Sequence, residues 1–347
     1  MPASLASLVS PIGPGVPIMT GGVEARLAAL LETVLGARPV SVRPLGGGCV
    51  ADVRRVDLSD GRAVVVKSTG AAPPATEQAA TATSATAATA AIAATDGTGG
   101  TDTAGASAAN QPPGQFDLEA FMLQYLRRHG PLPVPGVLHA APDLLVLEFL
   151  PGAAVATPAA EEDLGRRLAG LHAVSAVQFG FERDTLIGPL PQANPWTAQW
   201  LDFFREERLL AMAREAARAG ALPAPLLARI ERLAERLEKW LPPSAAPALL
   251  HGDLWGGNVL ADAARVTAVL DPALYFGDPE IELAFSMLFH SFGRRMYEAY
   301  AELRPIAREF FSERKDLYNL YPLLVHVRLF GGGYVAQVEA TLRRFER

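Results

Sequence analysis

Two kinds of hydrophobic pattern divide this chain, and they predict different secondary structure on either side of its middle. Short β-branched runs such as AVVVK at 63–67 predict strands within residues 39–68, with a turn at Ser59-Asp60-Gly61. Further along, apolar residues recur at helical spacing, which predicts helices over 116–129, 161–174, 196–219, 226–240, 281–292 and 305–312. We therefore expect an α+β protein with a small strand-rich lobe followed by a larger, mainly helical one.

Composition refines this division. Residues 1–19 carry no Lys or Arg and four prolines, so we expect a disordered extension, with Met19 as an alternative start. The Ala/Thr/Gly-rich stretch 71–113 has no aromatic residue and hardly any charge, which predicts a low-complexity insert. The expected domains are a nucleotide-binding lobe over 20–150, containing this insert, and a catalytic and substrate-binding lobe over 151–347.

Charge and cysteine content exclude several classes of protein. The 347 residues have a net charge of −6 and a pI of about 5.6, so no nucleic-acid partner is expected. No uninterrupted apolar run is long enough to span a membrane. Cys49 is the one cysteine, which excludes an internal disulfide and agrees with a cytoplasmic location.

Four features with chemical potential follow one another along the chain. A glycine triplet, Gly46, Gly47 and Gly48, precedes a strand, and Lys67 ends a β-branched strand. Glu119 lies early on the next helix, and HGDLWGGN at 251–258 follows in the second half. Glycines let backbone N–H groups approach phosphates, and a lysine held by a glutamate neutralises them. Together the four features predict a bilobal protein-kinase-like fold that binds ATP and transfers its phosphate.

Three polar side chains lie close together in HGDLWGGNVLADAARVTAVLD, the stretch 251–271. Asp253 precedes Asn258 by five positions, and Asp271 follows a short predicted hairpin. A carboxylate on an apolar segment needs compensation by a cation or a hydrogen bond. We expect Asp253 to act as general base and Asn258 and Asp271 to bind Mg²⁺ through oxygen ligands. His251 is expected to brace the loop through hydrogen bonds with the backbone.

The motifs PLGGGCVADVRRV, HGDLWGGNV, NPWTAQWLDFFREERL and DPALYFGDPEIELAFSMLF resemble the fructosamine kinase (ketosamine-3-kinase) family. The resemblance begins near Gly22 and omits only the insert. It implies ATP-dependent phosphorylation of the 3-hydroxyl of a ketosamine, either a small molecule or a glycated protein amine. The unstable product would break down and free the amine, which amounts to deglycation and repair.

The resemblance also implies roles for particular residues. Lys67 would contact the ATP phosphates and Glu119 would pair with it, while Trp255 would stack on the sugar. Glu148, Phe149 and Leu150 would form the hinge that meets adenine. Glu282 would brace the catalytic loop, and His326 would lie near the substrate, although a packed helix histidine is an equal alternative. Arg328 stands where a smaller polar residue is expected.

Two rival functions and one regulatory hypothesis stay open at this point. The chain could phosphorylate another alcohol, as aminoglycoside and choline kinases do, with Asp278, Glu280 and Glu298 as candidates for an acidic lining. It could also be a pseudokinase that only binds nucleotide. Cys49 beside the glycine triplet is a candidate redox-sensitive thiol, so the protein is expected to be a monomer or a redox-linked dimer through Cys49.

Overall fold

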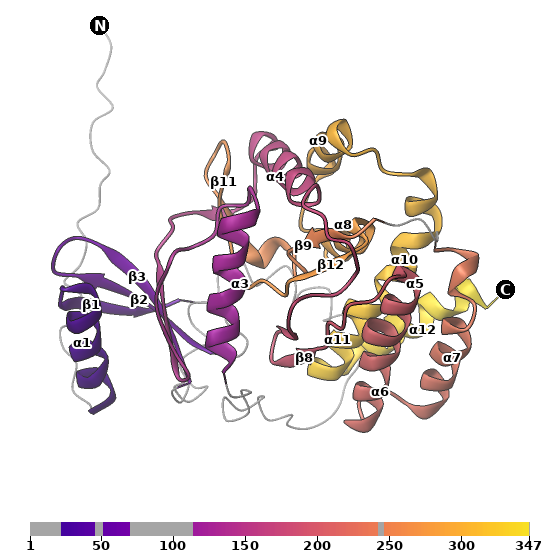
Figure 1. Cartoon of the computed structure of the whole chain (residues 1–347), viewed down its shortest axis with the longest axis horizontal. Coiled ribbons are helices and arrows are strands. Elements are labelled where there is room, and N and C mark those ends of the chain that lie inside the picture. Colours follow the sequence, from indigo (N-terminus) through magenta and orange to yellow (C-terminus); the bar gives the residue numbers. More distant parts are fainter. Residues whose placement is uncertain (1–21, 46–50, 70–113, 242–245, 347) are drawn as a thin grey trace, which may run out of the picture.

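The computed structural model describes residues 22–45, 51–69, 114–241 and 246–346 (Figure 1). A sheet-containing lobe lies at one end of the molecule and a larger helical lobe at the other (Figure 1), so the bilobal α+β prediction is confirmed. The expected domain boundary at 150–151 stays a prediction. The predicted extension 1–19, the insert 71–113, the triplet Gly46–Gly48 and Cys49 lie outside the described residues.

The first lobe is built on a five-stranded antiparallel sheet. Its strand order is β1–β2–β3–β5–β4. The β2–β3 hairpin turns at Ser59–Gly61 as predicted, and Gly61 has a φ of 86° there. The strands are β1 Pro39–Pro44, β2 Asp52–Leu58, β3 Ala63–Ser68, β4 Val137–Ala141 and β5 Leu144–Glu148.

A helix packs on each face of this sheet. Helix α1 (Gly22–Leu35) covers the face that carries Val64, Val66 and Val146. Helix α3 (Gln115–His129) packs on the opposite face, where Leu145 and Leu147 join the main core. Because side chains alternate along a strand, Val65 and Lys67 point to the α3 side.

In the second lobe, helices surround two short sheets and a β-hairpin. Strand β6 pairs with the β10–β11 hairpin, β9 pairs with β12, and β7 pairs with β8. The strands are β6 Ala153–Ala154, β7 Thr185–Ile187, β8 Leu190–Gln192, β9 Ala248–Leu250, β10 Val259–Ala261, β11 Val266–Val269 and β12 Tyr275–Gly277. The helices are α4 Pro158–Leu171, α5 Trp200–Phe203, α6 Ala211–Arg218, α7 Ala224–Ala234, α8 Pro279–Leu288, α9 Arg294–Leu303, α10 Lys315–Tyr318, α11 Leu320–Phe330 and α12 Gly333–Phe345.

Several predicted helices have other bounds in the structure, and two of them differ in kind as well. The helix expected from residue 196 begins at Trp200, because Thr197 forms a β-bridge with Phe179. Its middle turn, Phe204–Leu210, is π-helical. The helix expected over 305–312 is wrong for its first turn, since 305–307 have no helical structure and a π-helical turn covers Phe310–Arg314.

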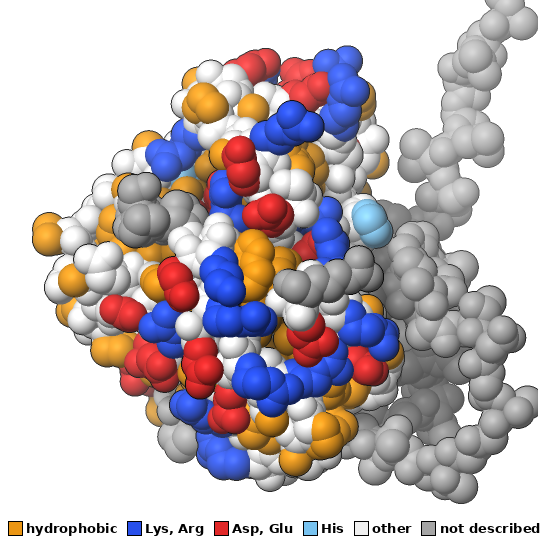
Figure 2. All heavy atoms as spheres, turned by 90° about the vertical axis from the view of Figure 1, so that its right-hand side faces the viewer, with side chains coloured by type: hydrophobic (Ala, Val, Ile, Leu, Met, Phe, Trp, Pro, Cys, Tyr) orange, Lys and Arg blue, Asp and Glu red, His pale blue; other side chains and the backbone are white. Residues whose placement is uncertain are grey.

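Charges of both signs are interleaved on the face formed by the C-terminal helices (Figure 2). Many of them pair, as Arg229 does with Glu346 at 2.6 Å and Arg218 with Glu215 at 2.7 Å. This face therefore shows no single-sign field of the kind that attracts a nucleic acid. No helix of the described chain is long and apolar enough to cross a membrane.

Helices α4 and α9 approach each other closely at Gly165. A Cβ added there would lie 2.1 Å from the carbonyl oxygen of Met296. We predict that Gly165→Ala lowers the free energy of unfolding by about 1–3 kcal/mol or more, because backbone must move to make room. Urea unfolding followed by circular dichroism measures this change.

Gly333→Ala is the matched control, since Gly333 is exposed at the start of α12 and an added Cβ would meet nothing within 4 Å. Its free energy of unfolding should change by less than about 1 kcal/mol. Equal effects of the two substitutions would contradict the packing described for α4 and α9.

Candidate active site between the two lobes

Lys67 joins the sheet to helix α3. Its ammonium donates to Glu119 Oε1 at 2.7 Å, and both side chains are largely buried. The pair forms although residues 71–113 separate β3 from α3 along the chain. The long insertion is compatible with docking because loop-closure entropy grows only slowly with loop length.

Asp271 brings the second lobe to the same ammonium. It follows β11, and its carboxylate also accepts a hydrogen bond from Lys67. Asp271 has a φ of 53°, one of two non-glycine residues in the described chain with positive φ. Such backbone strain is typical of functional sites, where the surrounding structure holds the residue in place.

Lys67, Glu119 and Asp271 shift one another's pKa values. Burial lowers the pKa of Lys67, but Asp271 and Glu119 together outweigh it and raise the net pKa, so the ammonium stays charged. Burial raises the pKa of Glu119. Partial burial also raises the pKa of Asp271, but Lys67 outweighs that effect and lowers the net pKa. Asp271 is therefore a carboxylate at neutral pH.

The HGD segment directly follows β9 in a conformation that requires glycine at its centre. Gly252 has a φ of 84°, and a Cβ there would lie 2.0 Å from the carbonyl oxygen of Ala273. The N–H of Ala273 donates to the carbonyl of His251 at 2.7 Å. His251 Nδ1 accepts from the N–H of Asp253 at 3.3 Å, so this histidine braces the loop as predicted.

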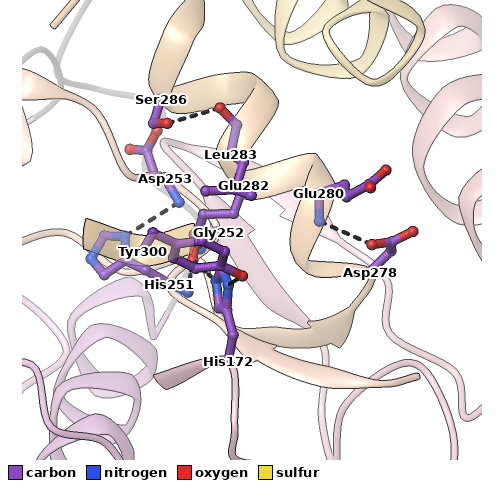
Figure 3. A network of polar contacts seen from close by, with 10 residues as sticks. All are labelled: His172, His251, Gly252, Asp253, Asp278, Glu280, Glu282, Leu283, Ser286 and Tyr300. Carbon is purple, nitrogen blue, oxygen red and sulfur yellow. Dashed lines mark hydrogen bonds and ion pairs between the residues drawn. The ribbon is translucent and has the colours of Figure 1, made fainter. Parts of the chain in front are cut away.

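Glu282 on helix α8 fixes the same loop through hydrogen bonds with its backbone. It accepts from the backbone N–H groups of His251 at 3.1 Å and Gly252 at 2.6 Å. His172 Nε2 lies 2.9 Å from Glu282, and His172 Nδ1 lies 2.8 Å from the Tyr300 hydroxyl (Figure 3). The predicted bracing role of Glu282 is confirmed, and it extends to helices α4 and α9.

Asp253 and Asn258 form one hydrogen-bonded unit. Asn258 Nδ2 donates to both the carbonyl and the Oδ2 of Asp253, each at 2.9 Å. Burial raises the pKa of Asp253 to about 7, and the charge of Asp271 adds to this effect. A carboxyl group with a pKa near neutrality is suited to accept a proton in general base catalysis.

The oxygen donors of this site fit Mg²⁺. Both hydrogen bonds of Asn258 use its amide nitrogen, which leaves Oδ1 for a cation. Asp271 contributes a carboxylate whose side chain is 47% exposed. The described residues contain no group of three or more His, Cys, Asp or Glu arranged to hold a metal. Two protein ligands agree with Mg²⁺ sites that use phosphates and waters for the other positions.

A cavity opens beside Asp253. Its lining is mainly apolar, including Tyr275, Tyr321 and Val325, and His326 also lines it. The Tyr321 hydroxyl donates to Gln192 at 2.7 Å, which fixes one wall of the cavity. The sequence analysis missed the two tyrosines, because neither belongs to the kinase-like motif. A mainly apolar cavity with a few polar groups is typical of a small-molecule site.

The predicted substrate residues Trp255 and His326 are connected through Phe289, and His326 lines the cavity. The Trp255 ring packs edge-to-face on Phe289 at 6.1 Å between centroids, and Phe289 contacts His326 at 5.0 Å. His326 comes from α11, far from the catalytic loop in sequence. The structure therefore brings both predicted substrate residues to one region, whereas their contact with a sugar stays a prediction.

The predicted hinge follows strand β5. Glu148 ends β5, and its Oε2 accepts from the N–H of Gly136 at 3.1 Å. The N–H of Phe149 donates to the carbonyl of Ala63 at 3.4 Å, and Leu150 continues toward β6. Because β6 pairs with β10 in the second lobe, this segment links the two lobes.

Three acidic residues considered for an aminoglycoside site, and also Arg328, form hydrogen bonds or ion pairs within the protein. Asp278 caps helix α8 and accepts from the Tyr318 hydroxyl at 2.7 Å. Glu280 pairs with Arg314 at 2.5 Å, and Glu298 pairs with Arg294 at 2.6 Å. None of the three lines the cavity beside Asp253. Arg328 pairs with Glu215 on α6 at 3.1 Å.

Solved structures share this protein-kinase-like fold. Aminoglycoside phosphotransferase APH(4)-Ia matches with a TM-score of 0.57 over 92% of this chain and 98% of its own, at 18% identity. A solved structure from Thermobifida fusca, titled "putative fructosamine-3-kinase", matches with a TM-score of 0.73 at 31% identity, over 92% of this chain and 98% of its own.

A family model described as fructosamine kinase matches residues 106–347, so the chain belongs to the fructosamine kinase family. This confirms the predicted family and enzyme class, a phosphotransferase acting on an alcohol group. A Synechocystis protein named "probable ketoamine kinase" is 43% identical over 52% of this chain. The chain spans only 60% of that relative. A chloroplastic protein-ribulosamine 3-kinase of Arabidopsis thaliana is 34% identical over 64% of this chain and 69% of its own length.

The Glu282 contacts generate a pH-dependent prediction. Burial raises the pKa of Glu282, but the contacts with His172 and the backbone N–H groups outweigh it and lower the net pKa. Stability from this group is therefore present above the ordinary glutamate pKa and is lost as the pH falls through the lowered value. We predict that Glu282→Gln lowers the free energy of unfolding by about 1–3 kcal/mol at pH 7, because an amide NH₂ would face an N–H donor.

Urea unfolding at pH 7 and at pH 4 measures this difference, which should shrink at the lower pH. Glu298→Gln is the control, since Glu298 is half-exposed and pairs with the exposed Arg294, and it should change stability little at either pH. A Glu282→Gln protein as stable as the wild type at pH 7 would contradict the assigned contacts.

Proposed function

We propose that this protein is an ATP-dependent kinase that phosphorylates the 3-hydroxyl of ketosamines of the fructosamine or ribulosamine type. The observation that carries the proposal is the convergence of Lys67, Glu119 and Asp271 from two lobes, beside an Asp253–Asn258 unit and a cavity. The relatives named ketoamine kinase and protein-ribulosamine 3-kinase support this acceptor class. Decomposition of the phosphorylated ketosamine would free the amine, which makes deglycation the physiological outcome.

The nucleotide would lie between the lobes. Its adenine would meet the Glu148–Leu150 backbone, and its phosphates would face Lys67 and the Gly46–Gly48 segment. Asp271 and Asn258 would hold Mg²⁺, which when bound neutralises the phosphates and favours the charged form of Asp253. Glu119 keeps the Lys67 ammonium oriented toward the phosphates.

The acceptor would occupy the cavity with its 3-hydroxyl at Asp253. Asn258 orients the Asp253 carboxylate, and Glu282 fixes the loop that carries it. The carboxylate takes the hydroxyl proton as the oxygen attacks the terminal phosphate. The apolar walls exclude water, which would otherwise compete as the acceptor.

The rival functions have less support. The acidic residues considered for an aminoglycoside site are engaged in caps and ion pairs outside the cavity. A pseudokinase would lack one of the five polar residues that this chain retains at 67, 119, 253, 258 and 271. A panel measuring ATP consumption with ribulosamines, fructosamines, kanamycin and choline tests the proposal, which predicts turnover with ketosamines. Turnover with kanamycin or choline alone would overturn it.

The role of Asp253 is tested by removing its charge. We predict that Asp253→Asn lowers kcat by about 10²–10⁴, the range of general base catalysis, because an amide cannot accept the hydroxyl proton. Asp262→Asn, in the exposed turn between β10 and β11, is the matched control and should keep wild-type activity. Coupled-assay kinetics on folded proteins measure both, and near-wild-type turnover of Asp253→Asn would refute the base assignment.

The metal assignment is tested by binding without turnover. We predict that ADP with Mg²⁺ raises the melting temperature of the wild type, and that EDTA removes most of this shift. Asp271→Asn should reduce the Mg²⁺-dependent part of the shift, because one anionic ligand is lost. Thermal denaturation with and without EDTA measures the effect. A shift in Asp271→Asn that responds to EDTA like that of the wild type would remove Asp271 from the metal site.

A further inference from the structure

Helix α11 leads from the cavity toward solvent. Pro322, His326 and Phe330 are spaced four residues apart and so share one face of the helix. Pro322 and His326 line the cavity together with Asp253. Phe330 lies one turn further along this face and is 55% exposed. The helix thus connects the proposed phosphorylation site with the surface.

Four aromatic rings in mutual contact extend from the cavity to the surface. His326 contacts Phe289 at 5.0 Å, Phe330 at 5.6 Å and Tyr334 at 4.9 Å between centroids. We call Phe289, His326, Phe330 and Tyr334 the aromatic ledge. Phe289 also contacts the Trp255 ring of the catalytic loop, so the ledge begins beside the proposed sugar site.

The backbone is shaped to place two of these rings. Gly331 and Gly332 have positive φ angles of 61° and 56°, and this turn brings Tyr334 of α12 back against His326 and Phe330. His290, directly after Phe289, has a φ of 52°, which is uncommon outside glycine. Such strain persists where the surrounding structure holds it, as at binding sites.

His326 presents a defined hydrogen-bonding group to the cavity. Its Nδ1 lies 2.7 Å from the carbonyl oxygen of Pro322, which can only accept, so Nδ1 carries the proton. Burial lowers the pKa of His326, which keeps the ring neutral. Its Nε2 is therefore an acceptor, and it has no hydrogen-bond partner among the described residues.

The chemistry of a ketosamine matches this arrangement. Its amine nitrogen is a few bonds from the 3-hydroxyl, and as a protonated amine it carries N–H donors. With the hydroxyl at Asp253, His326 offers an acceptor on the ledge side of the same cavity. Aromatic faces also attract a cation and pack well on an alkyl chain.

We propose that the aromatic ledge is the subsite for the amine-bearing substituent of the acceptor, with His326 Nε2 accepting an N–H of the amine. Phe330 and Tyr334 then contact the alkyl chain beyond the amine as it leaves the cavity. Because the ledge ends at the surface, it accommodates a lysine side chain attached to a peptide. The inference rests on the proposed function and extends it to peptide-borne ketosamines.

Steady-state kinetics with two acceptors test the ledge. One is a ketosamine of glycine, and the other is the same sugar on the lysine side chain of a short peptide. We expect Phe330→Ala and Tyr334→Ala each to lower the ratio of kcat/KM for the peptide over the glycine acceptor by about threefold to tenfold, mainly through KM. Phe311→Ala is the matched control, since Phe311 is also a half-exposed phenylalanine, and its ratio should match the wild type.

The two outcomes separate this inference from the proposed function. A wild type that phosphorylates both acceptors, with an unchanged ratio in both variants, overturns the ledge alone. A wild type that phosphorylates no ketosamine overturns the proposed function itself. His326→Gln, whose Oε1 can accept in place of Nε2, should keep a higher kcat/KM than His326→Leu, and equal losses would contradict the acceptor role.

Discussion

The contact of one ammonium with two carboxylates from different parts of the chain is the constraint on which this structure depends. Lys67 reaches Glu119 on α3 and Asp271 in the second lobe, so a single cation ties sheet, helix and catalytic segment together. The buried charges of Lys67 and Glu119 are stable because they compensate each other, and the half-exposed Asp271 adds a second anionic partner for Lys67. Their arrangement also defines a place where a nucleotide's phosphates and Mg²⁺ balance the same charges. The ion pairs that join the two lobes thus also form the proposed nucleotide-binding site.

The catalytic loop is fixed just as firmly, but by backbone contacts. Glu282 accepts from two consecutive N–H groups, and the carbonyl of Ala273 lies where only a glycine fits at position 252. His172, at the C-terminal end of α4, holds Glu282, and Tyr300 on α9 holds His172 in turn. Asp253 is therefore carried by a rigid segment beside a cavity whose walls are also fixed. Positioning of this kind accounts for much of the catalysis in phosphoryl transfer.

The sequence predicted the parts of this site that depend on local chemistry. The order of Lys67, Glu119, Asp253, Asn258 and Asp271 was sufficient to predict the lobes and the pairing of Lys67 with Glu119. The sequence could not predict which acidic residues are available to bind a substrate. Asp278 and Glu280 are not available, because they bond to Tyr318 and Arg314, which are distant in sequence. The aromatic ledge was missed for the same reason, since its rings come from the residue after α8 and from α11 and α12. The signal was present in the spacing of Pro322, His326 and Phe330, but nothing local marked that helix face as functional.

The central claim is that the convergence of these groups transfers a phosphate to one hydroxyl of a ketosamine. Nuclear magnetic resonance of the product measures this most directly, using ATP, Mg²⁺ and a ¹³C-labelled fructosamine with the wild-type protein. The account predicts a new phosphate ester whose ³¹P signal couples to C3 of the sugar and then disappears as the free amine forms. Hydrolysis of ATP with an unmodified sugar, or an ester at another carbon, would contradict it.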